Sequence, residues 1–277
     1  MTAKGALAAA AAELTEAGVP SPSVDAEWLL ADVLDVTRTE LSADGLRELS
    51  DADLDAFRTL VERRARREPL AYVLGEWGFR SLTLRVDPRV LIPRPETESL
   101  VGRCLELLAD LPEPRVLDIG VGSGAIALAI ADEHPFARVV ATERSVGALE
   151  VARENRDRTG LEDRVELVGG GLFAGIEGPF DLVVSNPPYV ESAELESLEP
   201  EVRLFEPRDA LVATDVTERI VEGAPAVLQP GGALVLEVAD GDAGRVADLL
   251  TTRGYTEVTS SRDLAGRERV VDGQAGR

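Results

Sequence analysis

Residues 116–124 have the sequence Val-Leu-Asp-Ile-Gly-Val-Gly-Ser-Gly, an apolar run that passes directly into a glycine-rich loop. The aliphatic residues of 116–119 predict a buried strand, and the small residues of 125–131 predict the helix after the loop. Residues 139–142 predict a second strand, which ends at Glu143. A strand, a glycine loop, a helix and a second strand ending in an acid are typical of a nucleotide-binding pocket.

The same alternation of strand and helix continues along the chain and predicts an α/β fold. Because strands and helices take turns, we expect a parallel, doubly wound, Rossmann-like sheet. Helices are expected at 146–158 and 244–253. Further strands are expected at 165–168, at 182–185, at 233–238 after the turn Pro230-Gly231-Gly232, near Val258 and at 269–271.

A second informative stretch is 180–189, with the sequence Phe-Asp-Leu-Val-Val-Ser-Asn-Pro-Pro-Tyr. Residues 182–184 form an apolar strand, which the two prolines end because they lack a backbone donor and fix φ. Asn186 is therefore expected on a rigid turn at the carboxyl end of a strand, the edge where open α/β sheets bind ligands. An Asn-Pro pair alone is as typical of a plain turn, but Asn-Pro-Pro-Tyr after an apolar strand is more specific.

The chemistry of Asn186-Pro187-Pro188-Tyr189 suits the capture of a flat NH2 group. Asn186 can accept one hydrogen and a backbone carbonyl the other, while Tyr189 can cover the planar face. The motif resembles that of S-adenosylmethionine-dependent methyltransferases that modify amino groups on planar systems. These include DNA adenine, RNA guanine and protein glutamine methyltransferases.

The glycine loop favours a methyltransferase over a dehydrogenase. In dinucleotide-binding proteins the loop cradles a pyrophosphate, whereas the acid Asp118 before this loop suits a cationic ligand. Glu143 can accept hydrogen bonds from both ribose hydroxyls. The expected cofactor-binding residues are Asp118, Gly120, Val121, Gly122, Ser123, Gly124, Glu143, Arg144, Leu172, Phe173 and Asn186.

Residues 1–73 have helical patterns and predict a small helical domain for substrate recognition. Helices are expected at 6–17, from Ser23 or Asp25 onward, at 41–49, and after a capping box formed by Ser50 and Asp53. The basic run 63–67 is expected to be a solvated helix end, with a partner-binding patch as the alternative. Residues 74–93 predict a β-hairpin linker with strands around 82–86 and 90–92, and residues 94–277 predict the catalytic domain, beginning with a helix at 97–108.

Composition excludes several classes of function. The chain has 277 residues, 44% of them hydrophobic, and no apolar run approaches the ~20 residues of a membrane span. One cysteine, Cys104, and one histidine, His134, give no material for a disulfide or a metal site built on either type, and we expect no metal and a cytoplasmic location. A net charge of −22 opposes direct nucleic-acid binding.

Five stretches together extend the resemblance over nearly the whole chain. They are residues 91–98 (Leu-Ile-Pro-Arg-Pro-Glu-Thr-Glu), 118–128, 186–189, 206–211 (Glu-Pro-Arg-Asp-Ala-Leu) and 262–267 (Arg-Asp-Leu-Ala-Gly-Arg). The sequence thereby resembles the HemK/PrmC family of release-factor glutamine methyltransferases. That family has a helical N-terminal domain, a hairpin linker and a catalytic domain. It methylates the glutamine side-chain nitrogen in the Gly-Gly-Gln tip of peptide chain release factors.

The resemblance implies S-adenosylmethionine as cofactor, S-adenosylhomocysteine as product and release factors as partners. It implies catalytic roles for Asn186, Pro187 and Tyr189. Substrate contacts are implied for Asn186, Pro187, Pro188, Tyr189, Arg94 and Glu96.

Three positions depart from the family pattern, namely Val121, Glu143 and Gly171, where a small polar residue, Asp and Asp are usual. They either loosen cofactor contacts or mark a paralogue that acts on another protein, a small molecule or a nucleic-acid amino group. A nucleic-acid adenine methyltransferase and a non-catalytic binding module also stay open as alternatives. The acidic stretch 191–201 is expected to be a solvated loop, with a lid over the substrate as the alternative.

Overall fold

The computed structural model describes residues 1–43, 45–212 and 214–276. The chain divides into two compact units, each with its own core. The first comprises Met1–Glu76 together with Leu198–Phe205, and the second comprises Trp77–Ser197 together with Glu206–Arg277. Each unit is therefore assembled from two separate parts of the sequence.

The first unit is helical, as the sequence predicts for its larger part. The capping box at Ser50 is present: the Asp53 amide donates to Ser50 Oγ at 3.1 Å, and the Ser50 amide donates to Asp53 Oδ2 at 3.2 Å. The helix expected at 41–49 is wrong in its bounds, because the helix in this region runs from Arg38 to Ala43. The helices are α1 (Ala3–Glu16), α2 (Pro22–Leu34), α3 (Arg38–Ala43), α4 (Asp51–Ala65), α5 (Leu70–Leu74) and, from the second part, α9 (Pro200–Phe205).

A buried ionic cluster in this unit corrects two expectations. Arg64 is 4% exposed; its Nε donates to Asp25 Oδ2 at 2.7 Å and its Nη1 donates to Glu201 Oε1 at 2.9 Å. Arg67 adds two further bonds to Glu201, from Nε at 2.7 Å and from Nη2 at 2.6 Å. The basic run is therefore not simply a solvated helix end, and Glu201 is not part of a solvated loop.

A β-hairpin follows, formed by β1 (Glu76–Phe79) and β2 (Leu82–Arg85). The strand expected around 82–86 is confirmed as β2, but its partner in the hairpin is β1, which precedes it, and not the segment 90–92. Residues 90–92 are not a strand: the Val90 amide donates to the Asp87 carbonyl in a turn. The turn is held by Arg89, whose guanidinium pairs with Asp87 at 2.7 Å.

The second unit is built on a sheet that has seven strands among the described residues, in the order β5-β4-β3-β6-β7-β9-β8. The first five of these strands run parallel, as predicted, whereas β9 runs antiparallel to both β7 and β8. The strands are β3 (Arg115–Ile119), β4 (Arg138–Glu143), β5 (Val165–Gly169), β6 (Phe180–Ser185), β7 (Leu228–Glu237), β8 (Thr256–Arg262) and β9 (Glu268–Gln274).

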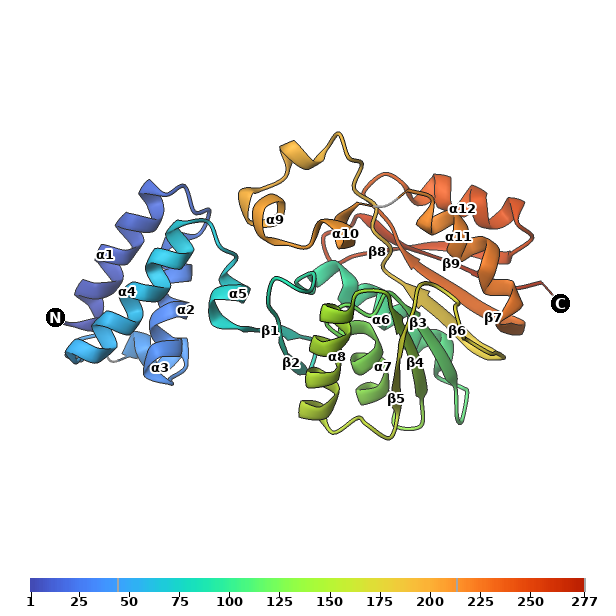
Figure 1. The fold of residues 1–277 in the computed structure, drawn as a ribbon, viewed down its shortest axis with the longest axis horizontal. Coiled ribbons are helices and arrows are strands. Elements are labelled where there is room, and N and C mark those ends of the chain that lie inside the picture. Colours follow the sequence, from blue (N-terminus) through green and yellow to red (C-terminus); the bar gives the residue numbers. More distant parts are fainter. Residues whose placement is uncertain (44, 213, 277) are drawn as a thin grey trace. The chain divides into compact units, whose positions relative to one another are not determined.

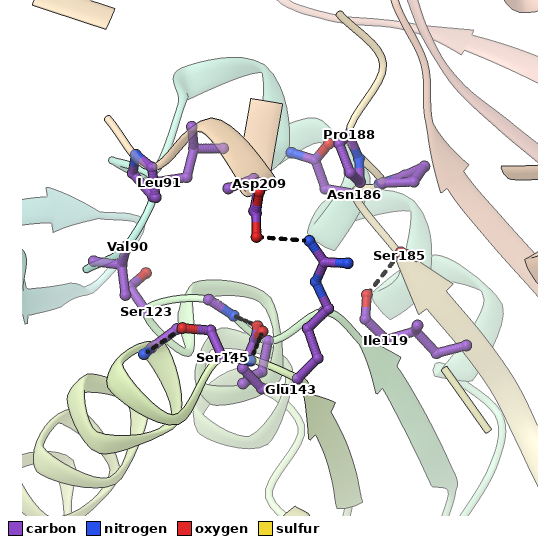
Figure 2. A pocket seen from close by; sticks show the side chains of 18 of the residues that line it. Val90, Leu91, Ile119, Ser123, Glu143, Ser145, Ser185, Asn186, Pro188 and Asp209 are labelled. Atoms are coloured by element: carbon purple, nitrogen blue, oxygen red, sulfur yellow. Dashed lines mark hydrogen bonds and ion pairs between the residues drawn. The ribbon is translucent and has the colours of Figure 1, made fainter. Parts of the chain in front are cut away.

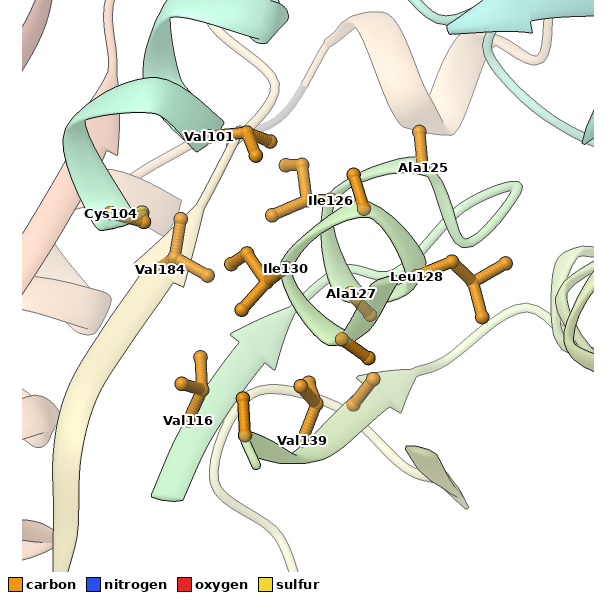
Figure 3. Close-up of a cluster of buried hydrophobic side chains, with 14 of the residues drawn as sticks. Val101, Cys104, Val116, Ala125, Ile126, Ala127, Leu128, Ile130, Val139 and Val184 are labelled. Carbon is orange, nitrogen blue, oxygen red and sulfur yellow. The ribbon is translucent and has the colours of Figure 1, made fainter. Parts of the chain in front are cut away.

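Helices cover both faces of this sheet (Figure 1). One core lies under α6 (Pro95–Leu108), α7 (Ala125–Glu133) and α8 (Val146–Thr159), where Ile126 and Ile130 of α7 pack on Val116 and Val184 (Figure 3). Cys104 is buried in the same core, and burial raises the pKa of its thiol. The other core lies under α11 (Val216–Gly223) and α12 (Ala243–Thr252).

Two parts of the second unit differ from the sequence prediction. β7 begins at Leu228, so the expected turn at residues 230–232 lies inside a strand, with Gly231 at φ +81°. The short helix α10 (Arg208–Leu211) and helix α11 were not predicted. No helix in the described ranges is long and apolar enough to span a membrane, and no cluster of metal-ligating side chains occurs there.

Candidate active site

A cavity of about 560 Å³ lies within the second unit, at the carboxyl ends of β3, β4 and β6 (Figure 2). That volume is typical of a small-molecule site, which runs from roughly 300 to 1,000 Å³. The cavity brings together many of the residues predicted from the sequence. These are Gly120, Val121, Gly122, Ser123, Glu143, Arg144, Leu172, Asn186, Pro187, Pro188 and Arg94.

The glycine loop forms one wall of the cavity. Gly120 and Gly122 have φ of +83° and +55°, a region that strongly favours glycine, and a Cβ added to either would meet no atom within 4 Å. Gly124 has a different role, since its added Cβ would lie 2.8 Å from Leu128 Cδ1 in helix α7. The first two glycines therefore open the wall, and the third lets the helix pack closely behind it.

Glu143 is the last residue of β4, and each of its carboxylate oxygens accepts a hydrogen bond from a backbone amide. Its Oε2 accepts from the Gly122 amide at 3.0 Å and its Oε1 accepts from the Ser145 amide at 2.8 Å. Ser145 in turn caps helix α8, because its Oγ accepts from the Ala148 amide at 3.2 Å. Each carboxylate oxygen keeps a second lone pair, so Glu143 can still accept a bond from a ligand.

Asp118 lies apart from the cavity surface. It is fully buried in β3, two residues before the loop, and neither carboxylate oxygen has a hydrogen-bond partner among the described residues. Burial raises the pKa of this carboxyl to about 7. Contact between Asp118 and a ligand in the cavity stays a prediction.

Asn186 follows directly after the last residue of β6 and lines the cavity. The strand end is fixed by Ser185, whose Oγ donates to the Ile119 carbonyl at 2.7 Å (Figure 2). The Asn186 side chain is held by Thr97 of α6, since its Nδ2 donates to Thr97 Oγ1 at 3.4 Å. Pro187 and Pro188 continue the cavity wall.

Tyr189 does not line the cavity as the structure describes it. Its hydroxyl donates to Glu237 Oε1 at 3.5 Å, and burial raises the pKa of the phenol to about 12. The prediction that Tyr189 covers a planar group stays a prediction. Phe173 and Glu96 also lie outside the described cavity lining: Phe173 packs against Gly223, and Glu96 accepts from Arg267 Nη2 at 2.9 Å.

Arg94 and Glu206 join two stretches that are far apart in the sequence. Arg94 lines the cavity and donates to Glu206 Oε1 at 2.5 Å, while Glu206 is buried.

Nearby, the exposed pair Arg144 and Asp209 spans part of the cavity, at 3.1 Å between Nη2 and Oδ2 (Figure 2). Arg144 follows β4 and Asp209 belongs to α10, so the pair joins two segments of the cavity lining.

Sequence reasoning missed several residues of the cavity. Thr97, Thr142, Ser145, Asp209 and Arg219 line it without having been predicted. Thr142 and Ser145 lie within two residues of the predicted Glu143, so their closeness to it in the sequence could have indicated them. Thr97 and Asp209 lie in two of the stretches that carried the family resemblance, whereas Arg219 lies in a helix with no such signal.

Two solved methyltransferases share the fold of this chain. A methyltransferase from Pyrococcus furiosus is 22% identical, with a TM-score of 0.52, and the match covers 78% of this chain and 99% of that one. The T. thermophilus 16S rRNA N2 G1207 methyltransferase, solved with AdoMet and guanosine, is 19% identical, with a TM-score of 0.55, over 73% of this chain and 50% of that one. The fold is thus that of the Rossmann-like methyltransferases.

The sequence comparisons narrow this class to one family. Residues 5–75 match the family model for the PrmC N-terminal domain, and residues 103–202 match that for the methyltransferase small domain. The release factor glutamine methyltransferase of Deinococcus radiodurans is 46% identical over 96% of this chain and 95% of its own length, and that of Geobacter sulfurreducens is 43% identical over 95% and 93%. The chain belongs to the release factor glutamine methyltransferase family, which confirms the resemblance noted in the sequence.

Proposed function

We propose that this chain transfers a methyl group from S-adenosylmethionine to the side-chain amide nitrogen of the glutamine in the Gly-Gly-Gln motif of peptide chain release factors. The observation that carries the proposal is the position of Asn186. It lines the same cavity as Gly120, Gly122 and Glu143, at the carboxyl edge of the sheet. Near full-length similarity to release factor glutamine methyltransferases supports the choice of substrate.

The cavity fits the proposed cofactor. Gly120 and Gly122 leave open space where any other residue would place a Cβ, so a ligand can approach the backbone closely. Glu143 stands at the end of the second strand with unused lone pairs for ribose hydroxyls. When bound, S-adenosylmethionine supplies a methyl group on a positively charged sulfonium.

Asn186 would orient the substrate for transfer. An amide nitrogen is a weak nucleophile because its lone pair is delocalised into the carbonyl group. Asn186 Oδ1 and the Pro187 carbonyl can accept the two hydrogens of the substrate NH2 group, which orients the nitrogen and favours the positive charge that develops on it. The contribution of these residues is therefore positioning and electrostatic stabilisation.

We assign recognition of the release factor to the helical residues 1–73, and place the enzyme in the cytoplasm, where release factors act. The support for a separate recognition role is that these residues form a compact unit with a core of their own. The cavity lining lies entirely outside that unit in the described structure. The acidic net charge of −22 supports a protein partner over direct nucleic-acid binding.

A parallel methyl-transfer assay tests this proposal. The full-length chain and labelled S-adenosylmethionine are offered a release factor, its Gly-Gly-Ala variant, a ribosomal protein and a nucleic acid. Label is expected on the release factor alone, and mass spectrometry should place it on the glutamine of the motif. Label on the Gly-Gly-Ala variant, or preferential transfer to the ribosomal protein or the nucleic acid, would overturn the substrate assignment.

A further inference from the structure

Behind Asn186 lies a set of buried polar side chains for which the proposed function gives no role. β6 and β7 run parallel with Ser185 opposite Leu236, so the next residues, Asn186 and Glu237, reach the same edge of the sheet. Glu237 is 1% exposed, and Thr97, from the first turn of α6, is 4% exposed. A buried carboxylate beside the residue that selects the substrate calls for a physical reason.

These side chains form a connected series. Asn186 Nδ2 donates to Thr97 Oγ1 at 3.4 Å. Glu237 Oε2 is buried and has no hydrogen-bond partner within 3.5 Å among the described residues, and the neighbouring Thr97 lowers the pKa of this carboxyl. Tyr189, three residues after Asn186, donates its hydroxyl to Glu237 Oε1 at 3.5 Å. Glu237 is thus linked to both sides of the Asn-Pro-Pro-Tyr turn.

The direction of the hydrogen bonds in this series follows from the number of hydrogens available. A threonine hydroxyl has one hydrogen to give, and an ionised carboxylate can only accept. An ionised Glu237 with an unpaired Oε2 attracts the one hydrogen of the neighbouring Thr97, which must then accept from its other neighbour. That neighbour is the Asn186 side chain, whose NH2 group is thereby turned toward Thr97, which leaves Oδ1 for the ligand.

We propose that Thr97 and Glu237 are positioning residues that fix the orientation of the Asn186 amide, so that its oxygen rather than its NH2 group meets the substrate. The identity of the substrate amide rests on the proposed function, but the orientation of the Asn186 amide does not. A reversed Asn186 would present two donors to a substrate NH2 group that itself only donates. The orientation therefore decides whether Asn186 attracts or repels a glutamine side chain.

The charge of Glu237 makes the orientation dependent on pH. Burial raises the pKa of Glu237 to about 7, Glu96 of α6 raises it further, and Thr97, Arg269 of β9 and Tyr189 lower it. Above this pKa the carboxylate accepts from Thr97. Below it, a protonated Glu237 can donate to Thr97, which can then give its own hydrogen to Asn186 Oδ1. Activity should therefore fall as the pH drops through about 7.

Nuclear magnetic resonance of the side-chain amides tests the orientation directly. The chain contains two asparagines, Asn155 and Asn186, so selective ¹⁵N labelling gives two NH2 groups to follow. The Asn186 signals are expected to shift with a midpoint near the Glu237 pKa of about 7. Asn155 donates to the carbonyls of Arg85 and Ser123, at 2.9 and 2.8 Å, and serves as the internal reference.

The variant Glu237→Gln should abolish the titration of the Asn186 signals, because no ionisable group remains at that position. Thr97→Val should abolish it as well, because it removes the connecting hydroxyl and keeps the shape of the side chain. Asn186 signals that are independent of pH in the wild-type protein, or that titrate equally in Glu237→Gln, would overturn the proposal. This measurement needs no substrate, so it stands even if the proposed reaction fails.

Kinetics of methyl transfer provide a second test. Thr97→Val is expected to lower kcat by between about twofold and tenfold, the equivalent of one hydrogen bond, with cofactor affinity unchanged. Thr97→Ser keeps the hydroxyl and should restore the rate, and Thr159→Val on α8 serves as the matched control. The part of the acid limb of the kcat profile that Glu237 contributes should disappear in Glu237→Gln, whereas a part contributed by Asp118, whose pKa is also about 7, should remain. An acid limb that is unchanged in Glu237→Gln, or an equal loss in Thr97→Ser, would contradict a positioning role.

Discussion

The two sides of the cavity are built by different means. On the cofactor side, Glu143 is tied to the amides of Gly122 and Ser145, all within a short stretch around two neighbouring strands. On the substrate side, Asn186 is held by Thr97, 89 residues away in the sequence, beside the buried carboxyl of Glu237, whose pKa Thr97 lowers. The first side is organised by backbone groups, and the second by buried side chains from distant segments.

Because the two sides are built differently, we expect substitutions on them to impair different properties of the enzyme. Backbone groups remain when a side chain is removed, so damage to the cofactor side should appear as weaker binding. A network of side chains loses its orientation when one member is changed, so damage to the substrate side should appear as slower transfer. The following variants separate binding from transfer, from the largest expected effect to the smallest.

Asn186→Ala should give the largest effect, and it should impair transfer far more than cofactor binding. It removes the acceptor for the substrate NH2 group, and loss of one preorganised polar group at a reacting centre costs ~10²–10³ in rate. Single-turnover methylation of a Gly-Gly-Gln release factor is the measurement, and Asn186→Asp, which keeps the shape but loses the amide donors, should also be impaired. Methyl transfer near the wild-type rate in Asn186→Ala would show that the motif serves only as a structural turn.

Glu143→Ala should weaken S-adenosylmethionine binding by roughly 1–3 kcal/mol, because it removes the ribose acceptor. The change also releases the amides of Gly122 and Ser145. Calorimetric titration measures the affinity, and Glu143→Asp, which restores the residue usual in the family, is the matched control. Unchanged affinity in Glu143→Ala would mean that the ribose lies elsewhere.

Gly171→Asp should raise the affinity for S-adenosylmethionine by about twofold to tenfold, which is the contribution of one added hydrogen bond. Gly171 lines the cavity, its φ lies outside the positive region, and a Cβ there would meet no atom within 4 Å. The variant restores the acid that the family resemblance implies at this position. If affinity falls instead, the cofactor makes no favourable contact at this position.

Asp209→Asn should have the smallest effect. The pair that Asp209 forms with Arg144 is exposed, and such ion pairs contribute about 0–1 kcal/mol. We expect cofactor affinity to change by less than about fivefold, and by less still at high salt. Stopped-flow binding at two ionic strengths is the measurement, and a large effect that survives salt would show that Asp209 contacts the ligand itself.

Much of the second unit could be predicted from the sequence because its signals are local. The strands and helices between residues 115 and 185 follow from apolar runs, glycine loops and a capping serine. Asn186, Gly120, Gly122 and Glu143 could be predicted for the same physical reason, since each lies at the end of an apolar strand or in the loop that follows one.

Residues whose role depends on distant partners could not be predicted. Arg64 belongs to a basic run that is typical of a solvated helix end, and its burial depends on Asp25 and Glu201. Glu237 ends a strand without any motif, and its link to Asn186 follows from the order of β6 and β7 in the sheet. The strand expected at 90–92 fails because a turn at Asp87 competes with the β-propensity of its residues.

The binding of Glu201 by Arg64 and Arg67 has a consequence for protein engineering. Because residues 198–205 belong to the helical unit, no single cut in the chain separates the two units. A chimera that exchanges residues 1–76 alone would inherit Arg64 without its own Glu201, whereas one that also carries residues 198–205 would keep the ionic cluster whole. The unit of exchange in this protein is therefore a helical bundle plus a short insert from the far side of the Asn-Pro-Pro-Tyr turn.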